Sequence, residues 1–279
     1  MDDTYIKSVS EFLAELPNEN EFYDRLLDNL FLFRGQGNKE WNLMPSALRN
    51  REDILNEELY IKEFMRMYPE EFIGMEKIDI LVKMQHYGIP TRLLDLTSNP
   101  LVALYFACVT ENKQDGVVYF FKKPITKGND LYVHIIMEYL FECKSHDCCW
   151  NDSMGEKLKN IIYNKLHIEL ERISSNGYKD IVSSNLPFII SVNYLNSRIK
   201  NQNGYFALYR GIETFKEIEY SKKIYIKAED KKRIIAELER IGIHSGYVFI
   251  DLNHGAEYIV NSIRNKNLEF NKRFRTGLD

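Results

Sequence analysis

Residues 98–109 contain the segment that most restricts the folds open to this chain. Ser98-Asn99-Pro100 predicts a helix start, because a side chain that can cap a helix precedes a proline at the first helical position. The run that follows, LVALYFACV, is almost entirely apolar. A helix of this kind must be buried on most of its sides, so the chain needs a core in which other elements surround it.

The residues just before this helix are rich in groups that can bind ligands. They follow a helical pattern that runs from about residue 78 to 87 and is stopped by Gly88-Ile89-Pro90. A simple link would need only Gly, Pro and a capping residue. This link adds an imidazole, a guanidinium, a carboxylate and hydroxyls, carried by His86, Tyr87, Thr91, Arg92, Asp95, Thr97 and Ser98. Because sites are often built on loops held by rigid elements, we predict the functional site here.

The remaining patterns favour an α+β fold with a mixed or antiparallel sheet of short strands and flanking helices. Helical patterns dominate the first part of the chain and strand patterns the later part, with no regular strand–helix alternation. We expect strands at 31–35, 115–121, 187–194, 204–211, 222–228 and 247–252, and helices within 5–30 and at 52–68, 230–241 and 255–264. The expected organisation is one domain over residues 1–279, with its core at 28–123 and 187–264 and a helical insertion at about 124–186.

Composition excludes several classes of protein. The 279 residues are 44% hydrophobic, enough for a full core, and a net charge of −4 gives no overall attraction to nucleic acid or anionic membrane. No apolar run approaches the ~20 residues of a membrane span. The acidic N-terminus does not resemble a signal peptide, and four cysteines do not make a disulfide scaffold. We therefore expect a cytoplasmic protein that does not bind membranes.

Arg34 is the first candidate for ligand binding outside the polar link. It follows three apolar strand residues and precedes Gly35, and a guanidinium at the end of a buried strand is costly unless it is paired. It can grip a phosphate, carboxylate or ribose, or it can form a structural ion pair with an acid such as Asp95. The helix that begins at Pro100 should point free backbone N–H groups at the same region, so a phosphate between them and Arg34 is geometrically possible.

The other candidates have structural alternatives that the sequence leaves open. His86 falls on the apolar face of its helix, where a histidine is more often part of the core than a ligand-binding group. Arg92 and Asp95 can form an ion pair within the link, and the Thr97 and Ser98 hydroxyls can be helix caps. A second polar segment places Arg198 and Gln202 before a strand, where the Gln202 amide can face a ligand or simply solvent.

No familiar catalytic signature is present, and no metal site is expected. Cys143, His146, Cys148 and Cys149 lie close together, but their spacing matches no standard structural zinc site. The sequence has no Walker A loop, no GxGxxG, no HExxH and no GxSxG.

Several motifs together resemble the FRG domain, a bacterial family named for the triplet that stands here as Phe33-Arg34-Gly35. They are FLFRGQ at 31–36, WNLMPSALR at 41–49, QHYGIPTRLLDLTSNPLVALYFA at 85–107, Arg-x3-Gln-x-Gly-x-Phe at 198–206 and GIHSGYVFIDLNHGAEYI at 242–259. The resemblance extends from about residue 28 to 264. One departure is Leu96, where the family commonly carries Trp after the Asp.

A more distant resemblance is to the ADP-ribosyltransferase superfamily. In those proteins an Arg and Gly of the first strand hold the nicotinamide ribose of NAD, a hydroxyl-rich second motif shapes the pocket, and a later Glu or Gln orients the reactants. Carried over by position, these roles fall to Arg34 with Gly35, to Thr97 with Ser98, and to Gln202. A neutral Gln202 would stabilise an oxocarbenium-like state poorly, and Glu257 is the nearest acidic alternative.

The resemblance implies an NAD-dependent ADP-ribosyltransferase-like or NAD-cleaving enzyme that acts as a toxin-like effector in bacterial conflict or phage defence. NAD would be its substrate, with no metal; neither an acceptor macromolecule nor an oligomeric state is indicated. The expected catalytic residues are Arg34, His86, Asp95 and Gln202, and the expected ligand-binding residues are Gly35, Gln36, Tyr87, Arg92, Thr97, Ser98 and Arg198. The rival hypothesis is a non-catalytic module in which the same groups hold a nucleotide, a modified base or a protein partner.

Overall fold

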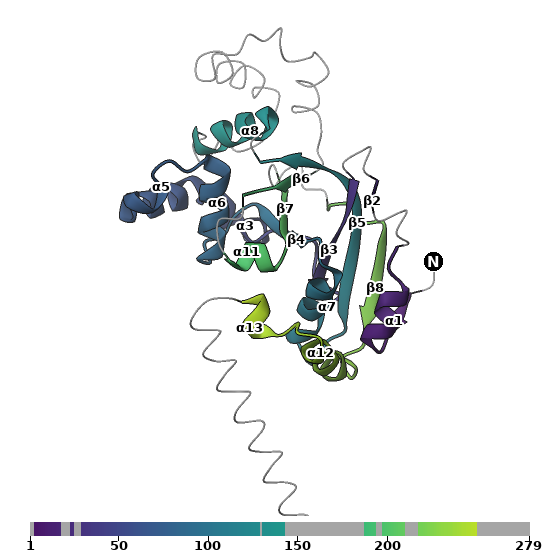
Figure 1. Ribbon diagram of the computed structural model, residues 1–279. Helices are drawn as coiled ribbons and strands as arrows, with labels where there is room; N and C mark the ends of the chain where they lie inside the picture. Colours follow the sequence, from purple (N-terminus) through teal and green to yellow (C-terminus); the bar gives the residue numbers. More distant parts are fainter. Residues whose placement is uncertain are drawn as a thin grey trace, which may run out of the picture.

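The structure, a computed structural model, describes residues 3–17, 23–24, 29–128, 130–142, 187–193, 197–209 and 217–249. It confirms a mixed α+β architecture in which the strands form one continuous sheet (Figure 1). The strands are β1 (Tyr5–Ile6), β2 (Tyr23–Asp24), β3 (Asn29–Gln36), β4 (Leu93–Thr97), β5 (Gly116–Lys127), β6 (Phe188–Ser191), β7 (Gly204–Leu208) and β8 (Lys222–Ile226). They lie in the order β1-β8-β5-β6-β7-β4-β3-β2.

Five of these strands close into a barrel, because β5 pairs with β3 in addition to its other neighbours. Strand β5 is long enough both to extend the sheet and to close the barrel. One of its edges pairs with β3 over residues 117–124, and the other pairs first with β8 over 116–120 and then with β6 over 125–127. The ring β5-β6-β7-β4-β3 is weakest between β3 and β4, which share the single residue pair Phe33–Thr97.

The interior of this barrel is filled by one hydrophobic cluster to which all five strands contribute. Its strand members include Leu32, Leu94, Phe121, Ile189 and Ala207. Short helices α3 (Ser46–Arg49) and α4 (Arg51–Leu55), with the loop before them, add Leu43, Ala47, Leu48 and Ile54 to the same cluster. This segment therefore plugs the barrel.

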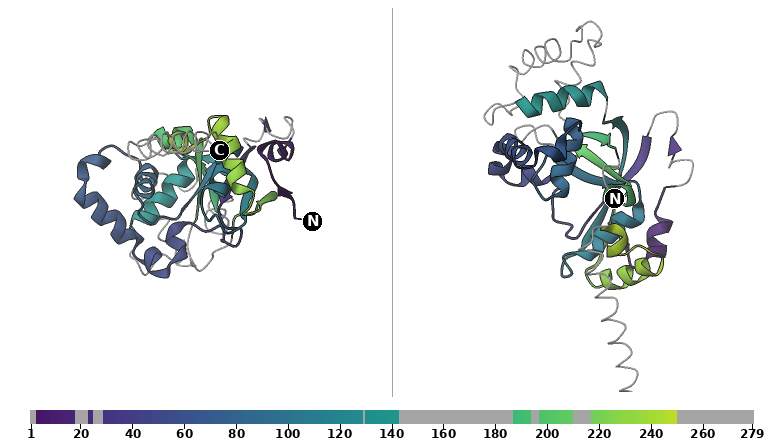
Figure 2. Two further views of the ribbon diagram at one scale, coloured as in Figure 1. Left: turned by 90° about the horizontal axis from the view of Figure 1, so that it is seen from below. Right: turned by 60° about the vertical axis from the view of Figure 1, so that its left-hand side comes forward.

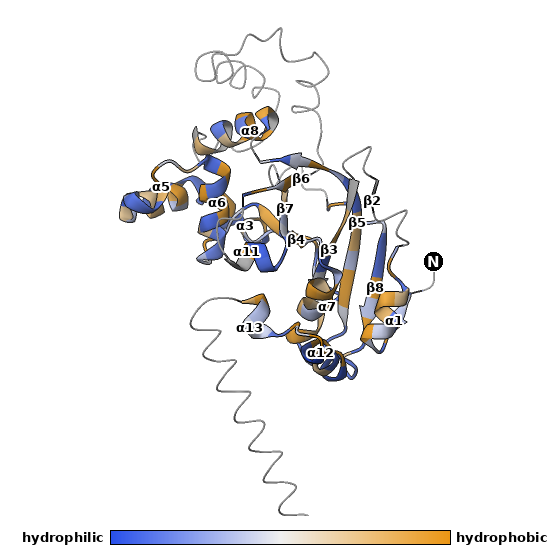
Figure 3. Ribbon diagram, viewed as in Figure 1, coloured by the Kyte–Doolittle hydropathy of each residue, from blue (hydrophilic) through white to orange (hydrophobic). Residues whose placement is uncertain are grey.

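Helices cover the outside of the barrel in two groups, which lie on different sides of it (Figure 2). The first group is α1 (Val9–Ala14), α7 (Pro100–Val109) and α12 (Lys231–Arg240), packed on β3, β5 and β8. The second is α5 (Glu57–Met67), α6 (Lys77–His86) and α8 (Leu131–Glu142), packed on β4, β6 and β7. Helix α12 turns its hydrophilic side away from the sheet (Figure 3). The remaining short helices are η1 (Pro69–Phe72), α11 (Ser197–Asn201) and α13 (Ser245–Val248).

Helix α7 confirms the expectation of a buried apolar helix. Asn99 caps it, since its side-chain oxygen accepts from the backbone N–H groups of Leu101 and Val102. Gly35 of β3 permits close approach, because a Cβ atom at that position would lie 1.8 Å from the carbonyl oxygen of Ala103. Strand β3 and helix α7 are thereby packed backbone to backbone at the FRG triplet.

Several charged groups are buried in the core, among them Arg92 and Lys231. Arg92, only 1% exposed, forms a bidentate ion pair with Glu57 of α5, and both of its contacting nitrogens bond the same carboxylate. Lys231 of α12 donates hydrogen bonds of 3.0 Å to the carbonyls of Thr110 and Glu111, which directly follow α7. A buried charge of this kind is tolerated because its partners replace water.

Three expectations about secondary structure are wrong. The middle of the polar link is strand β4, because Leu94 and Leu96 point into the barrel while Leu93 packs under α6. Within 5–30 the described helix is only α1, since Ser8 caps it and the residues before it pair with β8. Residues 245–248 are helical, so the strand expected at 247–252 is absent from its described part. The helix expected at 255–264 and most of the insertion, residues 143–186, lie outside the described residues.

None of the helices among the described residues is both long and apolar enough to cross a membrane.

Candidate functional site

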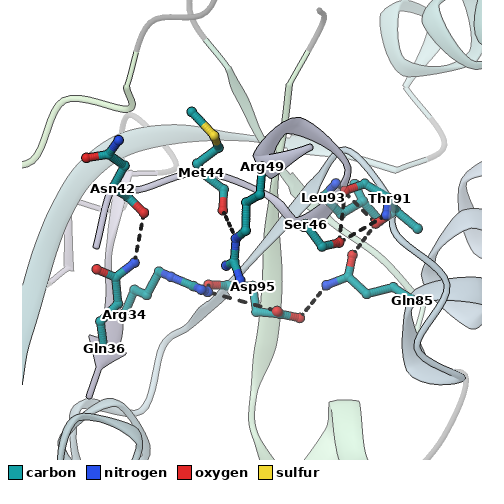
Figure 4. A network of polar contacts seen from close by, with 10 residues as sticks. All are labelled: Arg34, Gln36, Asn42, Met44, Ser46, Arg49, Gln85, Thr91, Leu93 and Asp95. Carbon is teal, nitrogen blue, oxygen red and sulfur yellow. Dashed lines mark hydrogen bonds and ion pairs between the residues drawn. The ribbon is translucent and has the colours of Figure 1, made fainter. Parts of the chain in front are cut away.

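The site centres on a contact between Arg34 of β3 and Asp95 of β4 (Figure 4). We name the junction of these two strands the barrel seam. Nη1 of Arg34 donates a 2.6 Å hydrogen bond to the main-chain carbonyl of Asp95 and lies 3.9 Å from carboxylate oxygen Oδ2. The Arg34 side chain is 15% exposed and the Asp95 side chain 65% exposed. The guanidinium thus anchors the backbone at this seam, and the carboxylate stays open to solvent.

The Asp95 carboxylate is oriented by Gln85, a residue of α6 (Figure 4). Gln85 Nε2 donates a 2.8 Å hydrogen bond to Asp95 Oδ1. The other end of the amide is fixed, because the hydroxyl of the fully buried Thr91 donates to Gln85 Oε1. The backbone N–H of Thr91 in turn donates to the hydroxyl of Ser46 at 3.1 Å. This chain of hydrogen bonds links the barrel plug to the exposed carboxylate.

Two adjoining cavities flank this network, with volumes of about 110 Å³ and about 140 Å³. They share Asp95, Leu96 and Gln202 as lining residues. The smaller also has Val82, Gln85, His86, Ile199, Gly204, Tyr205 and Phe206 in its wall. The larger also has Phe33, Arg34, Gly35, Thr97, Val102 and Phe106. Arg34, His86, Asp95 and Gln202 therefore meet at one groove, although they come from four separate segments of the chain. We name these two cavities the His86 cavity and the Arg34 cavity.

The electrostatics of the groove depend on Arg34. Burial lowers the pKa of its guanidinium, the Asp95 carboxylate opposes that effect, and the nearby Arg49 lowers the pKa further. Nε of Arg34 is buried and has no hydrogen-bond partner in the part of the chain that the structure describes. When N–H donors of a buried cation have no acceptor in the protein, they favour binding of an oxyanion or a ribose hydroxyl.

Hydrogen bonds of Thr97 and Gln202 link the wall of the Arg34 cavity to helix α13, close to the last described residues. The Thr97 hydroxyl donates to the carbonyl of Gln202 and accepts from the backbone N–H of Asn99. Gln202 Nε2 donates a 3.0 Å hydrogen bond to the carbonyl of Val248 in α13. The Thr97 hydroxyl is therefore used structurally, while the side chain of Gln202 still lines both cavities.

Several predicted ligand-binding residues lie elsewhere. Arg92 does not reach the groove and does not pair with Asp95, because Glu57 holds it inside the protein. Tyr87 is 63% exposed and packs near Phe64, outside both cavity walls. The buried Gln36 donates to the carbonyl of Asn42 at 3.3 Å. Ser98 lines neither cavity, and its backbone N–H donates to Asn203. The side chain of Arg198 lies outside the described part of α11.

The N-terminus of α7 is not an open anion site, contrary to the expectation. Pro100 has no backbone N–H, and Asn99 already accepts from Leu101 and Val102. The N–H of Ala103 donates to the Asn99 carbonyl. A ligand at this end of the groove would therefore have to bind side chains rather than the helix terminus.

Metal ligation finds no support among the residues that the structure describes, where no group of three or more His, Cys, Asp or Glu side chains could hold an ion. The cluster Cys143, His146, Cys148 and Cys149 falls outside those residues.

The sequence did not indicate two residues of the site, Gln85 and Arg49. Gln85 stands one residue before His86, and the helical period alone could have placed it near the following strand. Arg49 lies at the end of α3 and is brought to Arg34 only by the path of the barrel plug. No local signal in the sequence predicts that approach.

The fold and the groove define an α+β protein with a closed five-strand barrel and a site at the barrel seam. Residues 29–116 match the family model of the FRG domain, which supports the FRG resemblance over that region. The matched region runs from β3 to the first residue of β5 and includes Arg34, His86 and Asp95, but not Gln202. No curated protein and no solved structure matches the chain.

Proposed function

We propose that the groove binds NAD and cleaves the bond between nicotinamide and ribose, with water or an acceptor macromolecule as the attacking nucleophile. One observation carries the proposal: Arg34, His86, Asp95 and Gln202 line two adjoining cavities that share Asp95, Leu96 and Gln202. A groove that offers a guanidinium and apolar side chains along the same wall suits a ligand that has both an anionic group and a planar ring.

The side chains that line the two cavities suggest where each part of NAD lies. Val82, Ile199 and Phe206 form an apolar part of the mostly polar wall of the His86 cavity, and a planar base can pack against that part. The wall of the Arg34 cavity includes the guanidinium of Arg34, whose Nε has no acceptor among the described residues. Such a group favours binding of a ribose or a phosphate. Asp95, at the boundary, would then face the ribose carbon from which nicotinamide departs.

Asp95 has the properties that this reaction requires. As the C1′–N bond breaks, its electron pair leaves with the nicotinamide nitrogen and positive charge develops on the ribose. A carboxylate that is already oriented stabilises this charge without reorganisation, and Gln85 supplies the orientation. A hydroxyl nucleophile, from water or an acceptor, then bonds C1′ and gives its proton to Asp95.

The second candidate function is binding of a nucleotide without turnover. Among the described residues that line the two cavities, Asp95 is the only carboxylate. Glycosidic cleavage commonly uses two carboxylates, and the Gln202 amide already donates to Val248. These features favour a nucleotide-binding module as the alternative.

Nicotinamide release from NAD by the purified protein separates the two functions. If the protein is an enzyme, we expect the wild type and Arg51→Ala to release nicotinamide and Arg34→Ala to lose this activity. Arg51 is an exposed arginine of α4, so its variant controls for the loss of one positive charge. No release, together with a thermal shift on adding NAD, would favour the binding module. Release by Arg34→Ala at the wild-type rate would refute this site.

A further inference from the structure

Arg49 is a second cation at the groove, and most of its hydrogen-bonding capacity is unused. Its Nε donates a 3.2 Å hydrogen bond to the carbonyl of Met44, which fixes the base of the guanidinium. Within the described part of the chain, no carboxylate pairs with it and no other group accepts its terminal N–H groups. The residue is exposed, and Figure 4 shows its guanidinium next to Arg34 and Asp95.

Arg34 has a matching surplus of donors. Within the described residues, only Nη1 is engaged, by the main-chain carbonyl of Asp95, and the buried Nε has no partner. The Asp95 carboxylate offsets part of the Arg34 charge, but its Oδ2 is 3.9 Å away and its Oδ1 accepts from Gln85. Two cations thus lie at a groove whose carboxylate, Asp95, is largely solvated and pairs only with Arg34 among the described residues.

The proximity of the two guanidinium groups has an energetic cost. Their repulsion is felt at Arg34, whose pKa Arg49 lowers. Like charges are held together in proteins when a shared anion offsets the repulsion, and a guanidinium fork matches a phosphate with two parallel hydrogen bonds. One phosphate group bound to each guanidinium would accept hydrogen bonds from the N–H donors of Arg34 and Arg49 that have no acceptor among the described residues.

We propose that Arg34 and Arg49 together hold a diphosphate, which identifies the ligand of the groove as a nucleoside diphosphate or a dinucleotide joined through a diphosphate. Arg49 stands outside the walls of both cavities, so the diphosphate would lie at the rim of the Arg34 cavity, with the rest of the ligand inside. This inference rests on the groove assigned under the proposed function, but diphosphate binding does not require bond cleavage.

Calorimetric titration with inorganic pyrophosphate and with ADP tests the inference directly. We expect both to bind the wild type, and Arg49→Gln to weaken both by about tenfold or more, a loss equal to roughly 1.4 kcal/mol per tenfold. Arg49→Lys should lose part of the affinity, because it keeps the charge but not the fork. Arg51→Gln is the matched control and should bind within about twofold of the wild type. An unchanged melting temperature for Arg49→Gln would show that the loss is not one of folding.

The outcomes distinguish this inference from the proposed function. Diphosphate binding that depends on Arg49, without nicotinamide release, would support the diphosphate site and refute NAD cleavage. Nicotinamide release that is equal in the wild type and Arg49→Gln, and is not inhibited by pyrophosphate, would support cleavage and overturn the diphosphate site. Pyrophosphate bound equally by the wild type and Arg49→Gln, or by neither, would also overturn it.

Discussion

The side chain of Arg34 donates a 2.6 Å hydrogen bond to the main-chain carbonyl of Asp95, 61 residues further along the chain. It does so where β3 and β4 share only one residue pair. In a longer ladder, a main-chain N–H would serve such a carbonyl. Here a side chain closes the barrel, so the residue that we propose binds the ligand is also held in place by the fold.

Gln85 should act as a positioning residue for Asp95. Gln85→Glu places a second carboxylate against the first, which raises the apparent pKa of the pair through repulsion between like charges. Nicotinamide release should therefore reach its full rate only at a higher pH than in the wild type, because more of the pair is protonated at a given pH. Thr91→Ser, which keeps the hydroxyl that orients Gln85, is the control and should stay close to wild type. A Gln85→Glu enzyme with the wild-type pH profile would exclude this role.

The buried pair of Arg92 and Glu57 should matter for stability and not for ligand binding. Glu57→Gln removes the carboxylate charge that pairs with a buried guanidinium, and we expect the free energy of unfolding to drop by about 3–5 kcal/mol in urea denaturation. The double variant Arg92→Met/Glu57→Leu removes both charges and should recover most of that loss. A Glu57→Gln protein as stable as the wild type would contradict the observed pairing.

Gly35 should tolerate no side chain. The Cβ of Gly35→Ala would lie 1.8 Å from the Ala103 carbonyl oxygen and 2.7 Å from the Ala107 nitrogen, both backbone atoms of α7, so the helix would have to move. We expect a loss of roughly 3 kcal/mol or more, measured by thermal denaturation. Gly74→Ala is a suitable control, because that position has a φ of +72° but open space around it, and should cost only about 1 kcal/mol.

Asp79 should make stability depend on pH. Burial raises the pKa of this carboxyl of α6, and its Oδ1 has no hydrogen-bond partner among the described residues. Because the folded-state pKa lies above the unfolded value of 3.8, stability is highest below that pH and falls as pH rises through the folded-state pKa. Asp79→Asn should therefore raise the melting temperature at pH 7 and lose its advantage near pH 4. If the melting temperature of Asp79→Asn also exceeds that of the wild type at low pH, burial of the Asp79 charge is not the cause of the difference.

Local sequence signals were sufficient for elements whose burial is expressed in a short pattern. Helix α7 and strands β3 and β5 follow from apolar runs with clear caps or turns. Strand β4 was missed because its polar flanks indicate a turn, and only closure of the barrel shows that Leu94 and Leu96 face inwards. The sequence leaves open an ion pair of Arg92 with Asp95 and does not indicate the observed partner, since Glu57 reaches Arg92 from a helix 35 residues earlier. The approach of Arg49 to Arg34 likewise arises from tertiary structure alone.

The most direct test of the proposed site is a crystal structure of Asp95→Asn soaked with NAD, since this variant should bind the dinucleotide but not cleave it. We predict density for intact NAD across both cavities, with the nicotinamide in the His86 cavity and the diphosphate between Arg34 and Arg49. NAD bound at any other place on the protein, or an empty groove at saturating NAD, would contradict the proposed site.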